Sequence, residues 1–185
     1  SYSLVKVINM NYLGMFGPGP NPSASLIQDG KVVVLIEEER LNRIKMSPNN
    51  LPIQSALKCL EIAGLGLDDI DGIAWGWDSP RYVTEAMERF EQQAEKDDYL
   101  DDFSRLQQEL LINLYHPVKL ERSLQLGLAS ASKTNTLPPV HYFPHHLCHA
   151  ASTFYSSGFD EANIITIDGS GEETTALLCK GDGEG

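Results

Sequence analysis

An Asp-Gly pair at residues 29–30 is the strongest constraint on how this chain can begin to fold. The pair lies between two runs rich in β-forming residues, 23–27 and 31–36. Asp-Gly is favoured in two-residue hairpin turns, where both positions need a positive φ. An apolar run at residues 4–9 predicts a buried strand before this hairpin. The chain is therefore expected to open with three strands that can pair antiparallel.

The next elements predict an α/β fold. Residues 52–63 begin with a proline, carry apolar side chains at a helical period and end before Gly64, which predicts a helix. Residues 70–77 predict a further strand. Three meandering strands, a helix and a strand are how a ribonuclease-H-like half-domain begins, although other α/β folds open in the same order.

The middle of the chain differs from its two ends. Residues 80–136 are polar, acid-rich and helix-prone, which predicts an insertion of two or three helices. After it, residues 140–143 predict a strand and residues 144–156 a helix. Two further strands are expected at 163–167 and 174–179, joined by a turn. We expect the strands at both ends of the chain to form one mixed sheet with helices on its faces.

Composition limits the function classes. A chain of 185 residues with 42% hydrophobic residues can bury its own core. The net charge of −12 argues against a nucleic-acid partner, and no apolar run is long enough for a membrane helix. Three widely spaced cysteines predict reduced thiols and a cytoplasmic location. Because the last residues follow directly on a hairpin, we expect the chain to be a piece of a longer protein.

Four of the five histidines lie between residues 141 and 149. His145 and His149 are spaced i, i+4 on the predicted helix, so their rings share one face and can share a divalent metal. His146 stands where a zinc protease has its glutamate base, which excludes that motif. Exposed or helix-capping histidines are the alternative interpretation, and no third ligand is evident in the sequence.

Residues 168–175 form a candidate phosphate site. Gly169 and Gly171 let backbone N–H groups turn toward an anion, and the hydroxyls of Ser170, Thr174 and Thr175 add donors. Asp168 could bind Mg²⁺ directly or through water. The alternative is a plain Asp-Gly hairpin turn.

A second group of candidate anion ligands lies near the N-terminus. Arg40, Arg43 and Lys45 follow an acidic triplet, so they could clamp an anionic substrate or simply pair with neighbouring acids at the surface. The Gly- and Pro-rich loop at residues 14–25 could pass close to a ligand phosphate, with Ser23 and Ser25 adding hydroxyls, or it could be a plain surface loop.

Taken in order, these pieces resemble the O-carbamoyltransferases of the nodulation-factor and antibiotic-biosynthesis type, which are related to the tRNA threonylcarbamoyl-transferase proteins. The resemblance is carried by EERLNRIK at residues 38–45 and above all by residues 145–172. That stretch begins with HHLCHAASTFYSSGFDEA and ends with ITIDGSGE. The helical middle of the chain matches poorly.

The resemblance implies a fold of the actin, Hsp70 and sugar-kinase type. Residues 1–185 would form its first ribonuclease-H-like half, with a helical insertion at about 80–136. In the family, a carbamoyl-adenylate is made from carbamoyl phosphate and ATP by a separate domain. Its carbamoyl group then passes to a hydroxyl of a small-molecule acceptor. His145 and His149 would hold a divalent metal, expected to be Fe²⁺, and the turn from Asp168 to Glu172 would lie along the nucleotide phosphates.

Two departures from the family pattern bear on activity. The family has a His-Asp-Ser segment at the start of the second strand, where the histidine serves the acceptor hydroxyl, whereas this chain reads Pro20-Asn21-Pro22-Ser23. The resemblance also places the third metal ligand, an aspartate, in the second half of the fold. We therefore expect this piece to be inactive alone and to self-associate through surface that the second half would cover. An ATP-dependent phosphotransferase or ATPase of the same fold, and a non-catalytic binding module, are the competing interpretations.

Overall fold

The computed structural model describes residues 10–96, 102–129, 136–172 and 174–182. The chain divides into two compact units, and each is described by itself. The first comprises residues 1–74 and 121–141, and the second comprises residues 75–120 and 142–185.

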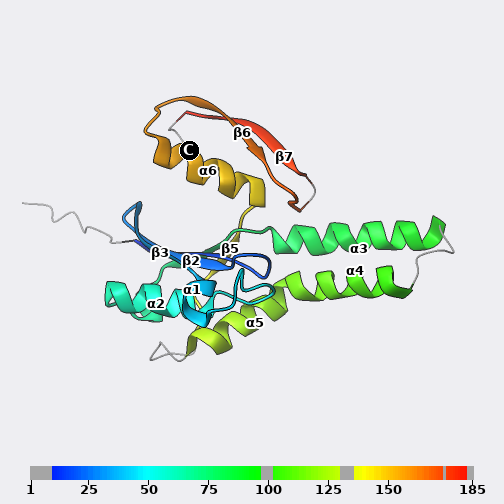
Figure 1. The fold of residues 1–185 in the computed structure, drawn as a ribbon, viewed down its shortest axis with the longest axis horizontal. Coiled ribbons are helices and arrows are strands. Elements are labelled where there is room, and N and C mark those ends of the chain that lie inside the picture. Colours follow the sequence, from blue (N-terminus) through cyan, green and yellow to red (C-terminus); the bar gives the residue numbers. More distant parts are fainter. Residues whose placement is uncertain (1–9, 97–101, 130–135, 173, 183–185) are drawn as a thin grey trace, which may run out of the picture. The chain divides into compact units, whose positions relative to one another are not determined.

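Most of a five-stranded sheet lies in the first unit. Its strands are β1 (Asn11–Phe16), β2 (Ser23–Gln28), β3 (Lys31–Glu37), β4 (Gly72–Trp75) and β5 (Val140–Tyr142), in the order β3-β2-β1-β4-β5. The first three strands form an antiparallel meander (Figure 1). Asp29 and Gly30 have φ angles of 50° and 76°, which confirms the predicted Asp-Gly hairpin. The described chain has three strands, helices and a fourth strand in this order, with β1 rather than residues 4–9 as the first described strand, and the fold class is α/β with a mixed sheet.

The core of the first unit lies between the meander and its helices. Leu13 and Leu26 face each other across β1 and β2, and both are fully buried. Helix α2 (Ile53–Ala63) packs on β2 and β3, and η1 (Leu67–Asp69) follows it (Figure 1). Part of α5 (Pro117–Leu128) also belongs to this unit. A Cβ at Gly127 would lie 2.7 Å from Cδ1 of Ile53, so glycine permits this close approach of α5 to α2.

A buried carboxylate caps α2 from a distance. The helix begins after Pro52, which offers no side-chain acceptor. Glu38, in the short helix α1 (Glu38–Asn42), is 2% exposed and accepts from the backbone N–H groups of Gln54 and Ser55 at 3.1 and 2.8 Å. The hydroxyl of Ser55 also donates to it at 2.6 Å. Glu38 therefore does for α2 what a local N-cap side chain does elsewhere.

The second unit contains a pair of packed helices and, separately, a helix that packs on a β-hairpin. Helices α3 (Ser79–Lys96) and α4 (Asp102–Tyr115) lie in the segment that predicted helices, and they pack against each other (Figure 1). Helix α6 (His145–Ser157) packs on a hairpin of β6 (Ala162–Ile167) and β7 (Ala176–Gly181). Ala150, Phe154 and Ile164 form the buried centre of that layer.

The strand expected at residues 4–9 lies outside the described residues. The structure corrects two other expectations, the loop that was expected to begin at Gly14 and the single sheet. The first described strand is β1, in which Gly14 pairs with Ser25 of β2. A Cβ at Gly14 would lie 2.6 Å from Oγ of Ser25, so the glycine makes room for its cross-strand neighbour. The prediction of one sheet is wrong, because within the described chain β6 and β7 pair with each other as a separate two-stranded sheet. An apolar run predicts a strand and its buried face, but it does not name the partner strand.

Two further observations concern the thiols and the helices. All three cysteines, Cys59, Cys148 and Cys179, are free thiols, as their spacing predicted. None of the helices in the described ranges is long and apolar enough to cross a membrane.

The outer face of the β6–β7 hairpin should drive self-association. Ile165 and Leu178 are opposite each other and are 69% and 71% exposed, and Ile167 beside them is 80% exposed. Contiguous exposed apolar side chains of this kind favour association, because burial removes them from water. We expect I165K and L178K each to shift the chain toward monomer in analytical ultracentrifugation. I62K, at an exposed isoleucine of α2, is the matched control and should change nothing. A wild-type chain that stays monomeric at every concentration tested would contradict this prediction.

Candidate metal centre

The packing of α6 on β6 brings Asp168 beside His145. The helix has 13 residues and the strand has 6, so both are roughly 20 Å long at 1.5 and 3.3 Å per residue. A short turn joins the end of the helix to the start of the strand. The chain therefore returns to the level of His145 at the residue that follows β6, which is Asp168.

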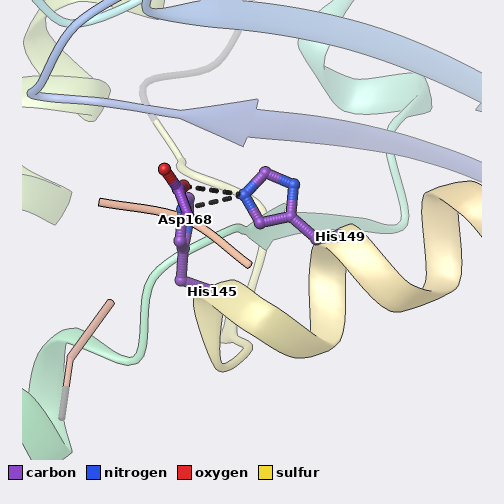
Figure 2. Close-up of side chains that lie close together, drawn as sticks. All are labelled: His145, His149 and Asp168. Atoms are coloured by element: carbon purple, nitrogen blue, oxygen red, sulfur yellow. Dashed lines mark hydrogen bonds and ion pairs between the residues drawn. The ribbon is translucent and has the colours of Figure 1, made fainter. Parts of the chain in front are cut away.

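Three possible ligand atoms converge at this point (Figure 2). Nε2 of His145 and Nε2 of His149 are 3.0 Å apart, one helical turn along the same face of α6. Oδ2 of Asp168 lies 3.1 Å from the first nitrogen and 3.2 Å from the second. Among the described residues, these three side chains form the group that could hold a metal ion.

The protonation of His145 favours cation binding at Nε2. The carbonyl oxygen of Gly76 lies 3.3 Å from its Nδ1. A carbonyl oxygen can only accept, so the contact places the proton of the neutral ring on Nδ1 and leaves the lone pair on Nε2. Two imidazole nitrogens and a carboxylate oxygen at these separations repel one another unless a proton or a metal ion lies among them.

Asp168 is ionised throughout the physiological pH range. The backbone N–H of Gly169 donates to its Oδ1 at 2.6 Å. That hydrogen bond, followed by the contacts of its carboxylate with Nε2 of His145 and of His149, lowers the pKa of Asp168 to about 2. The third ligand atom is therefore a charged oxygen that needs no deprotonation before it binds a cation.

The ligand set fits a divalent transition metal. Two imidazoles and one carboxylate form the facial set typical of non-haem Fe²⁺, whereas Mg²⁺ and Ca²⁺ prefer oxygen ligands. Neighbouring ligands at 90° and about 2.1 Å from a metal are separated by roughly 3.0 Å, and tetrahedral ligands by roughly 3.4 Å. The observed separations of 3.0–3.2 Å lie between these two values. Three protein ligands would leave at least one coordination position for another molecule.

One side of the group is open and the other is walled by aromatic rings. The side chains of His149 and Asp168 are 47% and 44% exposed, whereas that of His145 is 12% exposed. The ring of His145 lies 5.3 Å from that of Trp77, which stacks on Tyr115 of α4 at 4.9 Å. The helical segment thus supports the buried histidine, a role that nothing in the sequence indicated.

His146 and Cys148 do not belong to the ligand group. His146 is 4% exposed, and its Nε2 donates to the carbonyl of Thr174 at 2.9 Å. Its Nδ1 accepts from the hydroxyl of Thr166 at 2.7 Å, so both ring nitrogens are occupied. Burial, together with the charge of Glu172, raises the pKa of Cys148 to about 11, which keeps it a thiol.

The residues of the predicted phosphate turn make different kinds of contact in the structure. Asp168 lies in the ligand group with the two histidines, whereas the resemblance implied a place along the nucleotide phosphates for it and a third ligand in the second half of the fold. A Cβ at Gly171 would lie 2.7 Å from Cδ2 of His146, so this glycine lets the turn pack on that ring. The carboxylate of Glu172 accepts backbone hydrogen bonds. Gly169 and Ser170 are exposed, and the space beside Gly169 is open.

The predicted substrate cations lie in the other unit. Arg40 pairs with Glu37 at 3.0 Å and with Glu39 at 3.5 Å, which is the surface pairing that the sequence left open. Arg43 ends α1 with a φ of 62°, and Lys45 is exposed. Their role in substrate binding remains a prediction.

Comparison with known proteins assigns the family. A family model described as the carbamoyltransferase N-terminus matches residues 21–185. The nodulation protein NolNO of Sinorhizobium fredii is 38% identical over 165 residues, which are 87% of this chain and 21% of that protein. The uncharacterized protein sll1178 of Synechocystis is 34% identical over 175 residues, which are 92% of this chain and 27% of that protein. This chain belongs to the carbamoyltransferase N-terminus family, and it spans about a fifth to a quarter of these relatives.

Among solved structures, the chain is similar to YeaZ from Pseudomonas aeruginosa. The TM-score is 0.40 at 14% sequence identity, and the match covers 86% of this chain and 55% of that one.

Proposed function

We propose that this chain supplies the first, metal-binding half of the catalytic domain of an O-carbamoyltransferase. The whole enzyme would transfer a carbamoyl group from a carbamoyl-adenylate to a hydroxyl of a small-molecule acceptor. A separate domain would make that adenylate from carbamoyl phosphate and ATP. The observation that carries the proposal is the convergence of His145, His149 and Asp168, in a chain of the carbamoyltransferase N-terminus family.

The two histidines of α6 and the turn that begins at Asp168 suit this role. His145, His149 and Asp168 would hold a divalent metal such as Fe²⁺, which supplies Lewis acidity toward a phosphate oxygen when bound. The exposed Gly169 and Ser170 lie next to Asp168 and can follow the adenylate phosphates with a backbone N–H and a hydroxyl. The open side of the group leaves room for that ligand.

The acceptor base must come from outside the segment where the family carries it. Residues 20–22 are Pro-Asn-Pro, and Asn21 has a φ of 56° with its N–H bonded to the carbonyl of Met46. No side chain there can take a proton from an alcohol at neutral pH. Turnover therefore requires the remaining part of the enzyme, and this chain alone should bind the adenylate without transferring its carbamoyl group.

Adenylate binding tests the proposal against the ATPase interpretation. A stable carbamoyl-adenylate analogue should bind the Fe²⁺-loaded chain in anaerobic titration calorimetry, and binding should be lost in both H149A and D168N. An ATPase of this fold would use Asp168 on Mg²⁺-ATP without the histidines, so H149A would keep nucleotide binding and D168N would lose it. Wild-type binding that is independent of added transition metal would overturn the proposed function.

A further inference from the structure

Glu172 joins two segments that are distant in sequence. Its Oε1 accepts from the backbone N–H of Asp78 at 2.7 Å and from that of His145 at 2.9 Å. The second oxygen also lies 3.1 Å from the N–H of His145. The carboxylate is half-buried, and its contacts tie the start of α6 to the residues just before α3.

The start of α6 depends on this carboxylate. Pro144 precedes the helix and makes no side-chain cap hydrogen bond. The first N–H groups of a helix have no partner within the helix, and the helix dipole favours a negative charge near them. Glu172 meets both needs at His145, as Glu38 does at the start of α2, where the preceding residue is again a proline.

The same contacts set the orientation of the His145 ring. Gly76 accepts from Nδ1 of His145 and lies two residues before Asp78, whose N–H is held by Glu172. Glu172 thus fixes the backbone of His145 and also the segment that carries the acceptor for its ring. Partners of this kind set the tautomer and direction of a ligand imidazole.

We propose that Glu172 is a positioning residue for the metal ligand His145, and that it is not a phosphate ligand. This inference rests on the proposed function, because it concerns the metal site. A carboxylate repels phosphate, and the oxygens of Glu172 already accept two backbone N–H groups. Within the turn, Asp168 would bind the metal, Glu172 would hold the helix, and residues 169–170 would face the phosphates.

The variant E172Q tests the proposal with Co²⁺ as the probe. Glutamine keeps the shape and one acceptor oxygen, but it replaces the second oxygen, 3.1 Å from the backbone N–H of His145, with an N–H₂ group that opposes this donor. We expect the Co²⁺ affinity to fall about 10-fold or more, and the ligand-field bands of the saturated site to change. The same substitution at Glu161, which pairs with Lys180 on the surface of the same unit, should leave affinity and bands unchanged.

A metal-free readout separates the two possible failures. In ¹⁵N NMR, His145 of the wild type should be the Nδ1–H tautomer, and E172Q should show a mixture of both tautomers. If wild-type protein binds no Co²⁺, the proposed metal site fails. If it binds Co²⁺, H145A loses it, and E172Q matches the wild type in affinity, bands and tautomer, the role of Glu172 alone is overturned. Should E172Q not fold, E172D keeps the charge, shortens the reach by one methylene and is judged by the same criteria.

Discussion

Replacing His145 with alanine should lower the affinity of this chain for Fe²⁺ or Co²⁺ by more than about 100-fold. The reason is that His145 is the one ligand held from several sides. Its ring donates to Gly76 and lies against Trp77, and its backbone N–H is bound by Glu172. Removing it leaves one imidazole and one carboxylate, which bind a transition metal loosely. Anaerobic titration calorimetry measures the loss directly.

Variants of the other two candidate ligands, with one control histidine, test which residues form the site. H149A and D168N should lose affinity to a similar extent, because their ligand atoms lie 3.0 and 3.1 Å from Nε2 of His145. H141A removes an exposed histidine of β5 and should leave metal binding unchanged. Affinity that falls equally in all four variants, or in none of them, would show that the group of three is not the site.

The two glycines of the turn should respond to alanine in opposite ways. In G171A the new Cβ would lie 2.7 Å from Cδ2 of His146 and 2.7 Å from the carbonyl oxygen of Thr174. Neither neighbour can move easily, because His146 is buried and bonded at both nitrogens. We expect G171A to lower the free energy of unfolding by about 2–3 kcal/mol, as measured by chemical denaturation.

Gly169 is the matched control two residues away. A Cβ there meets nothing within 4 Å, so G169A should change stability by less than about 0.5 kcal/mol. Because residue 169 is open to a ligand, we expect G169A instead to weaken binding of the adenylate analogue. Equal stability of G171A and the wild type would mean that the turn does not pack on His146 as described.

Local patterns were sufficient for much of the fold and for two of the three residues of the candidate metal site. The Asp29-Gly30 turn, the helix that ends at Gly64 and the hairpin after residue 162 all follow from backbone preferences and apolar spacing, which act over a few residues. The pairing of His145 with His149 follows from helical geometry in the same way. The third ligand, too, was within reach of the sequence, since a helix and a strand of equal length must return the chain to its starting level.

The remaining features depend on contacts between distant residues, and no local pattern encodes them. Glu172 meets Asp78 across 94 residues and His145 across 27. The carbonyl of Gly76 orients the ring of His145, 69 residues away in sequence. The ring of Trp77, just before α3, lies against the same histidine. A glutamate after a glycine turn has the same local preferences whether it caps a helix or faces a phosphate. Its role depends on the backbone N–H groups of Asp78 and His145, which need an acceptor. These two groups come close to each other only when α6 packs on its hairpin and beside residues 76–78.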